Sequence, residues 1–384
     1  MSNPTPTEPI KLYSRSHAVA DWTCPRRRYL NYELGGTGIV SKELSLELFL
    51  GTVLHDGLAA IATQFKEKGK VDIDEIASQS AMDVRAVLGE VANPEWAKEQ
   101  AALVEGLLRG FNRHTFPILM QLYPTIIAIE QEVSYEHDGL VFMAKPDLVV
   151  ANHQDEVTYL EYKSTSSKKD QWIQSWNTAV QLHSTSKAIE STLGVEVSNV
   201  QVVGLYKGYI DRYGKQYTPI CYGYKRNGVP PFNKDEIAYD YKPGFKRTPT
   251  WELEGGVKKW IEGMPSEVLS DQFPFTPPIP INEDLVQTFF RQRGIREFEI
   301  YEALKVTEDE ELPESMRAQF MDAFFPQRWD QCSPAWGHAC PYKKICHGRI
   351  ENPLEAGFQI RESHHEAERE FHKQKELKSE NSNP

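Results

Sequence analysis

The sequence AKPDLVVANHQDEVTYLEYKST, residues 144–165, contains two apolar runs separated by the polar segment ANHQD. This pattern predicts a β-hairpin centred near Gln154. In that hairpin Asp147 and Glu161 are equidistant from the turn, so they face each other across an antiparallel pair with Cβ atoms about 5 Å apart. Lys163, two residues beyond Glu161, points to the same face. The stretch therefore predicts a local cluster of one aspartate, one glutamate and one lysine.

The two facing carboxylates need compensation, because like charges opposed on a sheet destabilise it. A divalent cation supplies that compensation, and Mg²⁺ suits a site of carboxylate oxygens, waters and a substrate phosphate. Lys163 would orient an attacking water and offset the charge that develops on phosphoryl oxygens. This is the chemistry of phosphodiester hydrolysis. The alternative is an ion-pair ladder on an exposed sheet face, and the surrounding sequence must decide between the two.

The elements around the hairpin predict a mixed α/β core. Helical spacing predicts a helix over residues 11–33, a second helix from Leu50 and an all-helical insertion over 73–122. Apolar runs predict three β-rich segments at 126–139, 140–150 and 156–164, then a helix over 169–193 and two strands at 199–210 and 217–225. Residues 226–280, rich in proline, glycine and aromatics, predict an irregular segment packed over the core, and 281–305 return to helix.

The motifs KPD, at 145–147, and EYK, at 161–163, resemble those of the PD-(D/E)XK nuclease superfamily. The predicted order of helices and strands also matches the core of that family. Within it, the chain most resembles the RecB and AddB branch, which includes CRISPR-associated iron-sulfur nucleases and phage exonucleases. The resemblance implies a restriction-endonuclease-like core, with a mixed central sheet flanked by helices.

In that branch a GxxxH motif precedes the core, and GTVLH spans residues 51–55 here. On a helix Gly51 and His55 share a face, so the glycine would allow close packing while the imidazole reaches a metal. The resemblance implies that His55 binds the ion together with Asp147 and Glu161. A nitrogen ligand suits Mn²⁺ better than Mg²⁺, so either ion is an expected activator. Taken alone, His55 would more often be a hydrogen-bonded structural histidine.

The family also carries a glutamine motif, QxxxY, on the helix after the EYK strand. Gln181 is its best match, and the tyrosine position is occupied by Thr185, which departs from the pattern. The resemblance makes Gln181 a catalytic-site residue. Its alternative interpretation is a surface amide, and the sequence leaves both open.

Three cysteines near the C-terminus, Cys332, Cys340 and Cys346, have the spacing C-x7-C-x5-C. Three thiols do not complete a tetrahedral site, so a fourth ligand must come from elsewhere, and Cys24 is the natural candidate. Iron-sulfur members of the family take one cysteine before the core and three after it. The resemblance thus implies a [4Fe-4S] cluster that joins the N- and C-terminal segments. Zinc is the alternative, although its usual paired C-x2-C spacing is absent.

The fifth cysteine, Cys221, lies in a predicted strand and is expected to be a buried apolar residue. Basic residues next to the two sites would neutralise DNA phosphates. The candidates are Arg26, Arg27, Arg28, Lys168 and Lys169. Trp172 and Trp176 would stack unpaired bases. The alternatives are solvated arginines and core tryptophans.

The composition is compatible with these assignments. The chain has 384 residues, 40% hydrophobic residues and a formal net charge of -12, which argues only against a uniformly basic surface. The polar N-terminal residues do not resemble a signal peptide, and no apolar run of membrane-spanning length stands out. We therefore expect a cytoplasmic protein with no membrane partner, in which grouped thiols bind metal rather than form disulfides.

The sequence predicts five regions: an N-terminal helical segment at 11–50, a nuclease core at 51–225, a segment over the core at 226–321, a cysteine region at 322–348 and a charged tail at 349–384. The expected function is a metal-dependent DNA nuclease, in particular an exonuclease acting on single strands or free ends in replication, recombination or repair, and possibly phage-encoded. One rival is a catalytically silent DNA-binding adaptor that assembles with a helicase or recombination partner. Another is a hydrolase of a different phosphate substrate.

Overall fold

A five-stranded mixed sheet lies at the centre of the protein. The computed structural model describes residues 11–43, 45–91, 93–166, 169–176, 179–210, 216–226, 237–238, 245–307, 309–333, 339–348, 352–363, 365–366 and 369–370. The strands follow the order β14 (Ile279–Pro280), β8 (Val197–Tyr206), β7 (Val157–Thr165), β6 (Leu148–Ala151) and β3 (Thr125–Ile129). Strands β7 and β8 are parallel, and the other neighbours are antiparallel. The predicted mixed α/β core is confirmed.

Strands β6 and β7 form the predicted hairpin. Leu148 pairs with Leu160, so one further step along the register places Asp147 opposite Glu161. In the turn, the Asn152 side-chain oxygen accepts hydrogen bonds from backbone N–H groups two and four residues further on. All four residues of β6 are buried, as expected for a strand covered on both faces.

A smaller sheet has the order β1 (Lys11–Ser14), β5 (Leu140–Ala144) and β4 (Val133–His137). The chain passes between the two sheets twice, so the predicted segments 126–139 and 140–150 are each divided into two strands. One break begins at Glu130, whose φ of 46° is rare for a residue other than glycine. The other break contains Pro146, which has no N–H to continue a strand ladder.

The predicted helix over residues 11–33 is wrong in its first turn and in its continuity. Residues Lys11–Ser14 form β1, which pairs with β5 in parallel. Helix α1 (Arg15–Thr23) ends at Cys24, whose backbone is extended because the next residue is Pro25. Helix α2 (Pro25–Arg28) and a π-helical turn (Tyr29–Glu33) follow.

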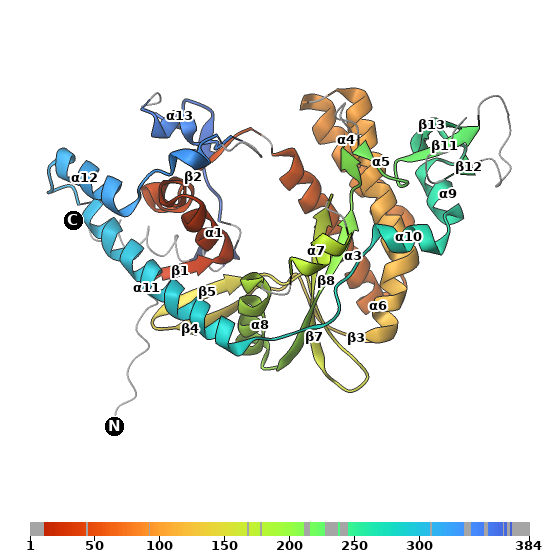
Figure 1. Ribbon diagram of the computed structural model, residues 1–384, viewed down its shortest axis with the longest axis horizontal. Helices are drawn as coiled ribbons and strands as arrows, with labels where there is room; N and C mark the ends of the chain where they lie inside the picture. Colours follow the sequence, from red (N-terminus) through yellow and green to blue (C-terminus); the bar gives the residue numbers. More distant parts are fainter. Residues whose placement is uncertain are drawn as a thin grey trace.

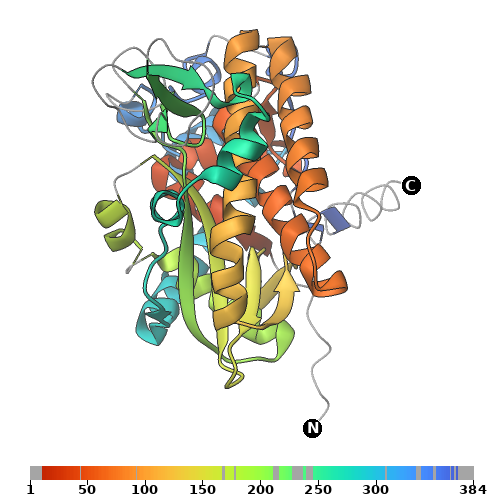
Figure 2. The same cartoon turned by 90° about the vertical axis from the view of Figure 1, so that its right-hand side faces the viewer.

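The predicted helix over 169–193 is likewise two helices, α7 (Lys169–Gln174) and α8 (Val180–Leu193). The expected helical content of 73–122 is confirmed by α4 (Ile73–Val91), α5 (Pro94–Gly110), a π-helical turn (Phe111–Thr115) and α6 (Phe116–Leu122). Helices α4 and α5 lie side by side in both views of the molecule (Figures 1 and 2).

Helix α3 (Leu46–Lys68) packs between the central sheet and this helical layer. Its length and apolar composition alone would allow it to cross a membrane, contrary to the expectation from the sequence. In the structure, Leu54, Leu58 and Ile61 are buried in the main hydrophobic core, so α3 is a core helix. Gly57 provides its close approach to α5, because a Cβ there would come within 2.6 Å of the Leu108 side chain.

The later part of the chain has more regular structure than its composition predicts. Residues 226–280, expected to be irregular, include β13 (Phe245–Pro249), α9 (Gly256–Gly263) and α10 (Ser266–Gln272). Strand β13 pairs with β11 (Tyr222–Arg226), which also pairs with β12 (Ile237–Ala238). The predicted helix at 281–305 is α11 (Glu283–Thr307), and α12 (Glu314–Phe324) follows it.

The segment expected to be a charged tail contributes an ordered strand, β15 (Phe358–Ile360), which pairs with β2 (Ile39–Ser41). Residues 371–384 lie outside the described part of the chain. In Figure 1 the elements α1, β2, α11, α12 and α13 (Lys343–Cys346) gather on one side of the sheets, and α4, α5 and α9 on the other. N- and C-terminal segments therefore form one side of the molecule together.

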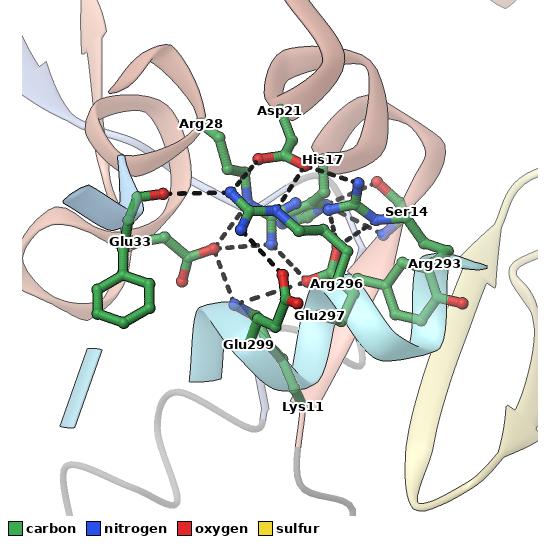
Figure 3. A network of polar contacts seen from close by, with 12 residues as sticks. Lys11, Ser14, His17, Asp21, Arg28, Glu33, Arg293, Arg296, Glu297 and Glu299 are labelled. Atoms are coloured by element: carbon green, nitrogen blue, oxygen red, sulfur yellow. Dashed lines mark hydrogen bonds and ion pairs between the residues drawn. The ribbon is translucent and has the colours of Figure 1, made fainter. Parts of the chain in front are cut away.

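A buried ionic network joins the N-terminal elements to α11 (Figure 3). Arg28, which is 0% exposed, donates hydrogen bonds to Glu33 at 2.8 Å and to Glu297 at 3.0 Å. Arg293 contacts Glu297 and also donates to Asp21 at 2.9 Å. Additional contacts come from Lys11 and Arg296. Each of these buried carboxylates thus contacts at least one guanidinium, as buried charges require.

Burial alone would raise the pKa of Glu297, but Arg28, Lys11 and Arg293 outweigh it and lower that pKa from 4.5 to about 2. The pKa of Glu33 is lowered to about 2 in the same way, mainly by Lys11 and Arg28 against its burial. Because both folded-state pKa values are depressed, this stabilisation is complete above about pH 4.5 and is lost as the pH falls towards about 2.

We predict that Glu297→Gln lowers the free energy of unfolding by about 3–5 kcal/mol, because it leaves two buried guanidinium groups without their shared carboxylate. The control is Glu299→Gln on the same helix, whose side chain is 52% exposed and should change stability by less than about 1 kcal/mol. Chemical denaturation at pH 7 measures both variants. Equal small effects would show that the network does not stabilise the fold.

Candidate functional site

Three side chains from separate elements meet at the edge of the central sheet. His55 lies in the third turn of α3, Glu130 directly follows β3, and Asp147 directly precedes β6. His55 Nδ1 lies 2.8 Å from Asp147 Oδ1 and 3.8 Å from Glu130 Oε1. Among the described residues, these three alone bring three metal-ligand atoms within 4.8 Å of one another. The group is a candidate divalent-metal site.

The charges of this group are strongly coupled. Burial opposes protonation of His55, but its hydrogen bonds to Asp147 and Glu130 raise its pKa to about 10. Burial would raise the pKa of Asp147, yet the contact with His55 and the Tyr162 N–H, which donates to Asp147 Oδ2 at 2.5 Å, keep it low. The short contact between imidazole and carboxylate lies where a cation could bind both groups. The donor set of one nitrogen and several carboxylate oxygens fits Mn²⁺ or Mg²⁺.

Glu161 lies next to this group, on β7, with its carboxylate turned to protein donors. It contacts Lys163 and the Tyr159 hydroxyl, and Gln181 Nε2 donates to its Oε1 at 2.8 Å. Burial, opposed by Lys163 and helped by Asp147, raises the pKa of Glu161 to about 7. Burial would lower the pKa of Lys163, but Glu161 and Asp147 raise it, so the ammonium form is favoured.

The structure therefore brings together all five residues expected at the site, namely His55, Asp147, Glu161, Lys163 and Gln181. The compact ligand group contains Glu130, which was not predicted, and Glu161 lies beside it. The Glu161 carboxylate contacts lysine, tyrosine and glutamine donors.

Glu130 was not predicted as a site residue, because it lies within the segment 126–139 that was predicted to be one continuous β-rich segment. Its backbone N–H donates to the Asp147 carbonyl at 3.1 Å, so the two residues are adjacent across the break between the sheets. Its Oε2 also pairs with Lys145 at 3.0 Å. Residues held in a left-handed conformation are often found at functional sites.

The role expected for Gly51 is wrong. A Cβ at Gly51 would meet no atom within 4 Å, so this glycine provides no close packing. Gly57, two residues after His55, provides it instead.

The four cysteines Cys24, Cys332, Cys340 and Cys346 line one small cavity. Cys24 lies between α1 and α2, and Cys346 ends α13. Burial raises the pKa of Cys332, and the neighbouring Cys340 and Cys24 raise it further. Burial and Cys340 raise the pKa of Cys346 to about 11. Mutual electrostatic effects of this kind require thiols that are close together.

No three of these thiols fall within 4.8 Å of one another in the described residues. A zinc ion with Zn–S bonds of about 2.3 Å would hold its sulfur ligands about 3.8 Å apart. The described residues therefore place the four cysteines around one cavity without forming a compact metal-ligand group of thiols. Cys221 lies elsewhere and is 0% exposed, which confirms its assignment as a buried residue.

Two of the three arginines expected to bind DNA serve the fold instead. Arg28 is in the buried ionic network. Arg26 donates to the Phe325 carbonyl at 2.8 Å and pairs with Asp322, which ties α2 to α12. The expectation of DNA contacts is wrong for these two, because their guanidinium groups are already engaged. Arg27 lines the cysteine cavity.

Lys168 lies outside the described residues, and of Lys169 the structure describes only the backbone, as the first residue of α7. Trp172 is 5% exposed and makes an edge contact with Trp176. Its indole also covers Gly204 of β8. Trp172 is thus a core residue and is not available to stack a base.

A mixed sheet with two facing carboxylates, a neighbouring lysine and an imidazole defines the class of metal-dependent nuclease cores. The family model described as the PD-(D/E)XK nuclease superfamily matches residues 14–347. The chain therefore belongs to the PD-(D/E)XK nuclease superfamily.

No curated protein matches the chain. Among solved structures, it is similar to one described as the crystal structure of SSO0001, with 14% sequence identity and a TM-score of 0.20. That similarity covers 42% of this chain and 71% of the other. A TM-score this low carries no argument about the fold or the function.

We predict that Glu130→Gln weakens Mn²⁺ binding by about 10- to 100-fold, because it removes a carboxylate next to His55 and Asp147. The control is Glu132→Gln, a change of the same kind two residues further along the chain, at a side chain that contacts the backbone of Glu366. Isothermal titration calorimetry measures both. Unchanged Mn²⁺ affinity in Glu130→Gln would exclude this glutamate from the site.

Proposed function

We propose that the protein is a divalent-metal-dependent deoxyribonuclease that acts as an exonuclease on single strands or free DNA ends. The observation that carries the proposal is the β6–β7 hairpin, which presents Asp147 opposite Glu161 with Lys163 beside them. Membership of the superfamily supports phosphodiester hydrolysis as the reaction.

His55, Asp147 and Glu130 would hold Mn²⁺ or Mg²⁺, with Glu161 as a further oxygen ligand or as a base for water. When bound, the ion supplies a Lewis acid for the phosphoryl oxygens and lowers the pKa of a water. The Asp147 carboxylate is held for this task by the Tyr162 N–H and by His55. Because one partner is a backbone N–H and the other a half-buried imidazole on a helix, the carboxylate is oriented before substrate arrives.

Lys163 would orient the attacking water and offset charge on the scissile phosphate. Its ammonium group lies against Glu161 and keeps its proton. Gln181, the second residue of α8, and Tyr159 hold the Glu161 carboxylate between them. Gln181 is therefore a positioning residue for Glu161.

The exonuclease mode and a role in DNA replication, recombination or repair, in a bacterium or a phage, come from resemblance to the RecB and AddB branch. The rival is a catalytically silent adaptor that binds DNA and a helicase. The presence of Asp147, Glu161 and Lys163 together favours the enzyme. Lys163 forms an ion pair with Glu161, and the charge of Asp147 also acts on it.

The second part of the proposal is a [4Fe-4S] cluster bound by Cys24, Cys332, Cys340 and Cys346. Their common cavity supports it, because four thiolates are the ligand set that such a cluster takes. This group would tie together Cys24 and Cys332, which are 308 positions apart in the chain. We expect its role to be structural, because it would fix both terminal segments on one side of the sheets.

We predict that Asp147→Asn and Lys163→Ala each reduce Mn²⁺-dependent cleavage of end-labelled DNA at least about 100-fold. The matched control is Asp155→Asn in the turn of the same hairpin, where φ is 61° and asparagine is well tolerated. It should leave the rate unchanged. Cleavage is measured on single- and double-stranded DNA with anaerobically purified protein.

Metal-dependent cleavage that persists in both Asp147→Asn and Lys163→Ala would contradict the active site. If wild-type protein binds DNA tightly and cleaves none with either metal, the adaptor reading is correct.

We predict that wild-type protein purified anaerobically contains about four iron atoms per chain and absorbs visible light, and that Cys24→Ser loses both. Cys221→Ser is the control, because that thiol is buried outside the cavity. Elemental analysis and absorption spectra measure the result. Stoichiometric zinc with no iron would establish the alternative metal.

A further inference from the structure

Arg15 is the first residue of α1 and directly follows β1 of the small sheet. This end of β1 lies next to the catalytic hairpin. The residue before Arg15, Ser14, pairs in parallel with Met143 of β5. In a parallel pair both strands end at the same edge of the sheet. From that edge the β5 chain runs on directly to Asp147, four residues after Met143. The fold therefore brings Arg15 to the edge where the catalytic carboxylates begin.

The charge of Arg15 interacts with the charges of Glu161 and Lys163. Its side chain is exposed, and within the described part of the chain it has no ion-pair contact. Desolvation lowers the pKa of Arg15, and the charge of Glu161 acts in the opposite direction. The charge of Arg15 also acts to lower the pKa of Lys163. An arginine therefore lies within electrostatic range of both residues, open to a substrate.

The backbone that carries Arg15 is held on both sides. The Ser14 N–H donates to His17 Nδ1 at 3.1 Å, and both residues are buried. Three residues before Ser14, Lys11 enters the buried ionic network through Glu33 at 3.0 Å (Figure 3). By contrast, Arg26 and Arg28 further along the N-terminal segment are used by the fold. The backbone at Arg15 is thus fixed, and its guanidinium forms no ion pair among the residues that the structure describes.

We propose that Arg15 binds a backbone phosphate of the DNA next to the scissile bond, and so positions the strand against Glu161 and Lys163. This assignment rests on the proposed nuclease function and adds a substrate contact to it. A guanidinium suits the task because its planar fork donates two parallel hydrogen bonds to a phosphate. A single phosphate contact contributes to affinity for every sequence and is screened by salt.

The test compares wild type, Arg15→Gln, Arg15→Lys and Arg291→Gln, an exposed arginine of α11. Steady-state cleavage of fluorescent single-stranded DNA gives KM and kcat. Binding of the same DNA to each variant in an Asp147→Asn background, at several salt concentrations, gives the slope of log affinity against log salt. We expect Arg15→Gln to raise KM about 10-fold and to reduce that slope by about one.

Arg15→Lys should retain the slope, since it retains the charge, and Arg291→Gln should match wild type. An unchanged KM and slope in Arg15→Gln, with its melting temperature retained, would overturn the assignment and leave the nuclease intact. A wild type that neither cleaves nor binds DNA would overturn the proposed function, and this contact with it.

Discussion

The register of the β6–β7 hairpin is the constraint on which the site depends. It opposes Asp147 and Glu161 on one face of a sheet, where two like charges repel each other in a buried environment. Side chains from the surrounding elements compensate the negative charge of these two carboxylates. Helix α3 brings His55 to one carboxylate, and Lys163 with α8 brings cationic and amide donors to the other. A divalent cation would complete this pattern, because it binds oxygen ligands and would offset the negative charge that the protein donors leave uncompensated.

A second constraint acts at long range. The N-terminal segment carries Cys24 and Arg28, and both interact with residues near the other end of the chain. The ionic network joins it to α11, while the cysteine cavity joins it to the region around α13. Strand β1, at the start of the same segment, pairs with β5, which leads into the hairpin. The contacts that fix the two chain ends therefore also fix the edge of the catalytic site.

Much of the site followed from sequence because its information is local. Two residues equidistant from a turn must face each other, so the Asp147–Glu161 register needed no tertiary knowledge. His55 and Gln181 followed from family motifs on predicted helices. The predictions that were wrong concern places where the chain passes between the two sheets. Nothing local in the apolar run 126–139 shows that it leaves one sheet and joins another at Glu130, and Lys11–Ser14 becomes a strand only because β5 offers an edge. Arg26 and Arg28 were misassigned for a similar reason, since they have acidic partners on distant helices.

The most direct test of the account is a crystal structure of the protein soaked with Mn²⁺, with anomalous diffraction to locate the ion. The account predicts an anomalous peak among His55, Asp147 and Glu130 or Glu161, and its loss in Asp147→Asn crystals. A peak elsewhere, or no peak under conditions in which Mn²⁺ supports DNA cleavage, would contradict it.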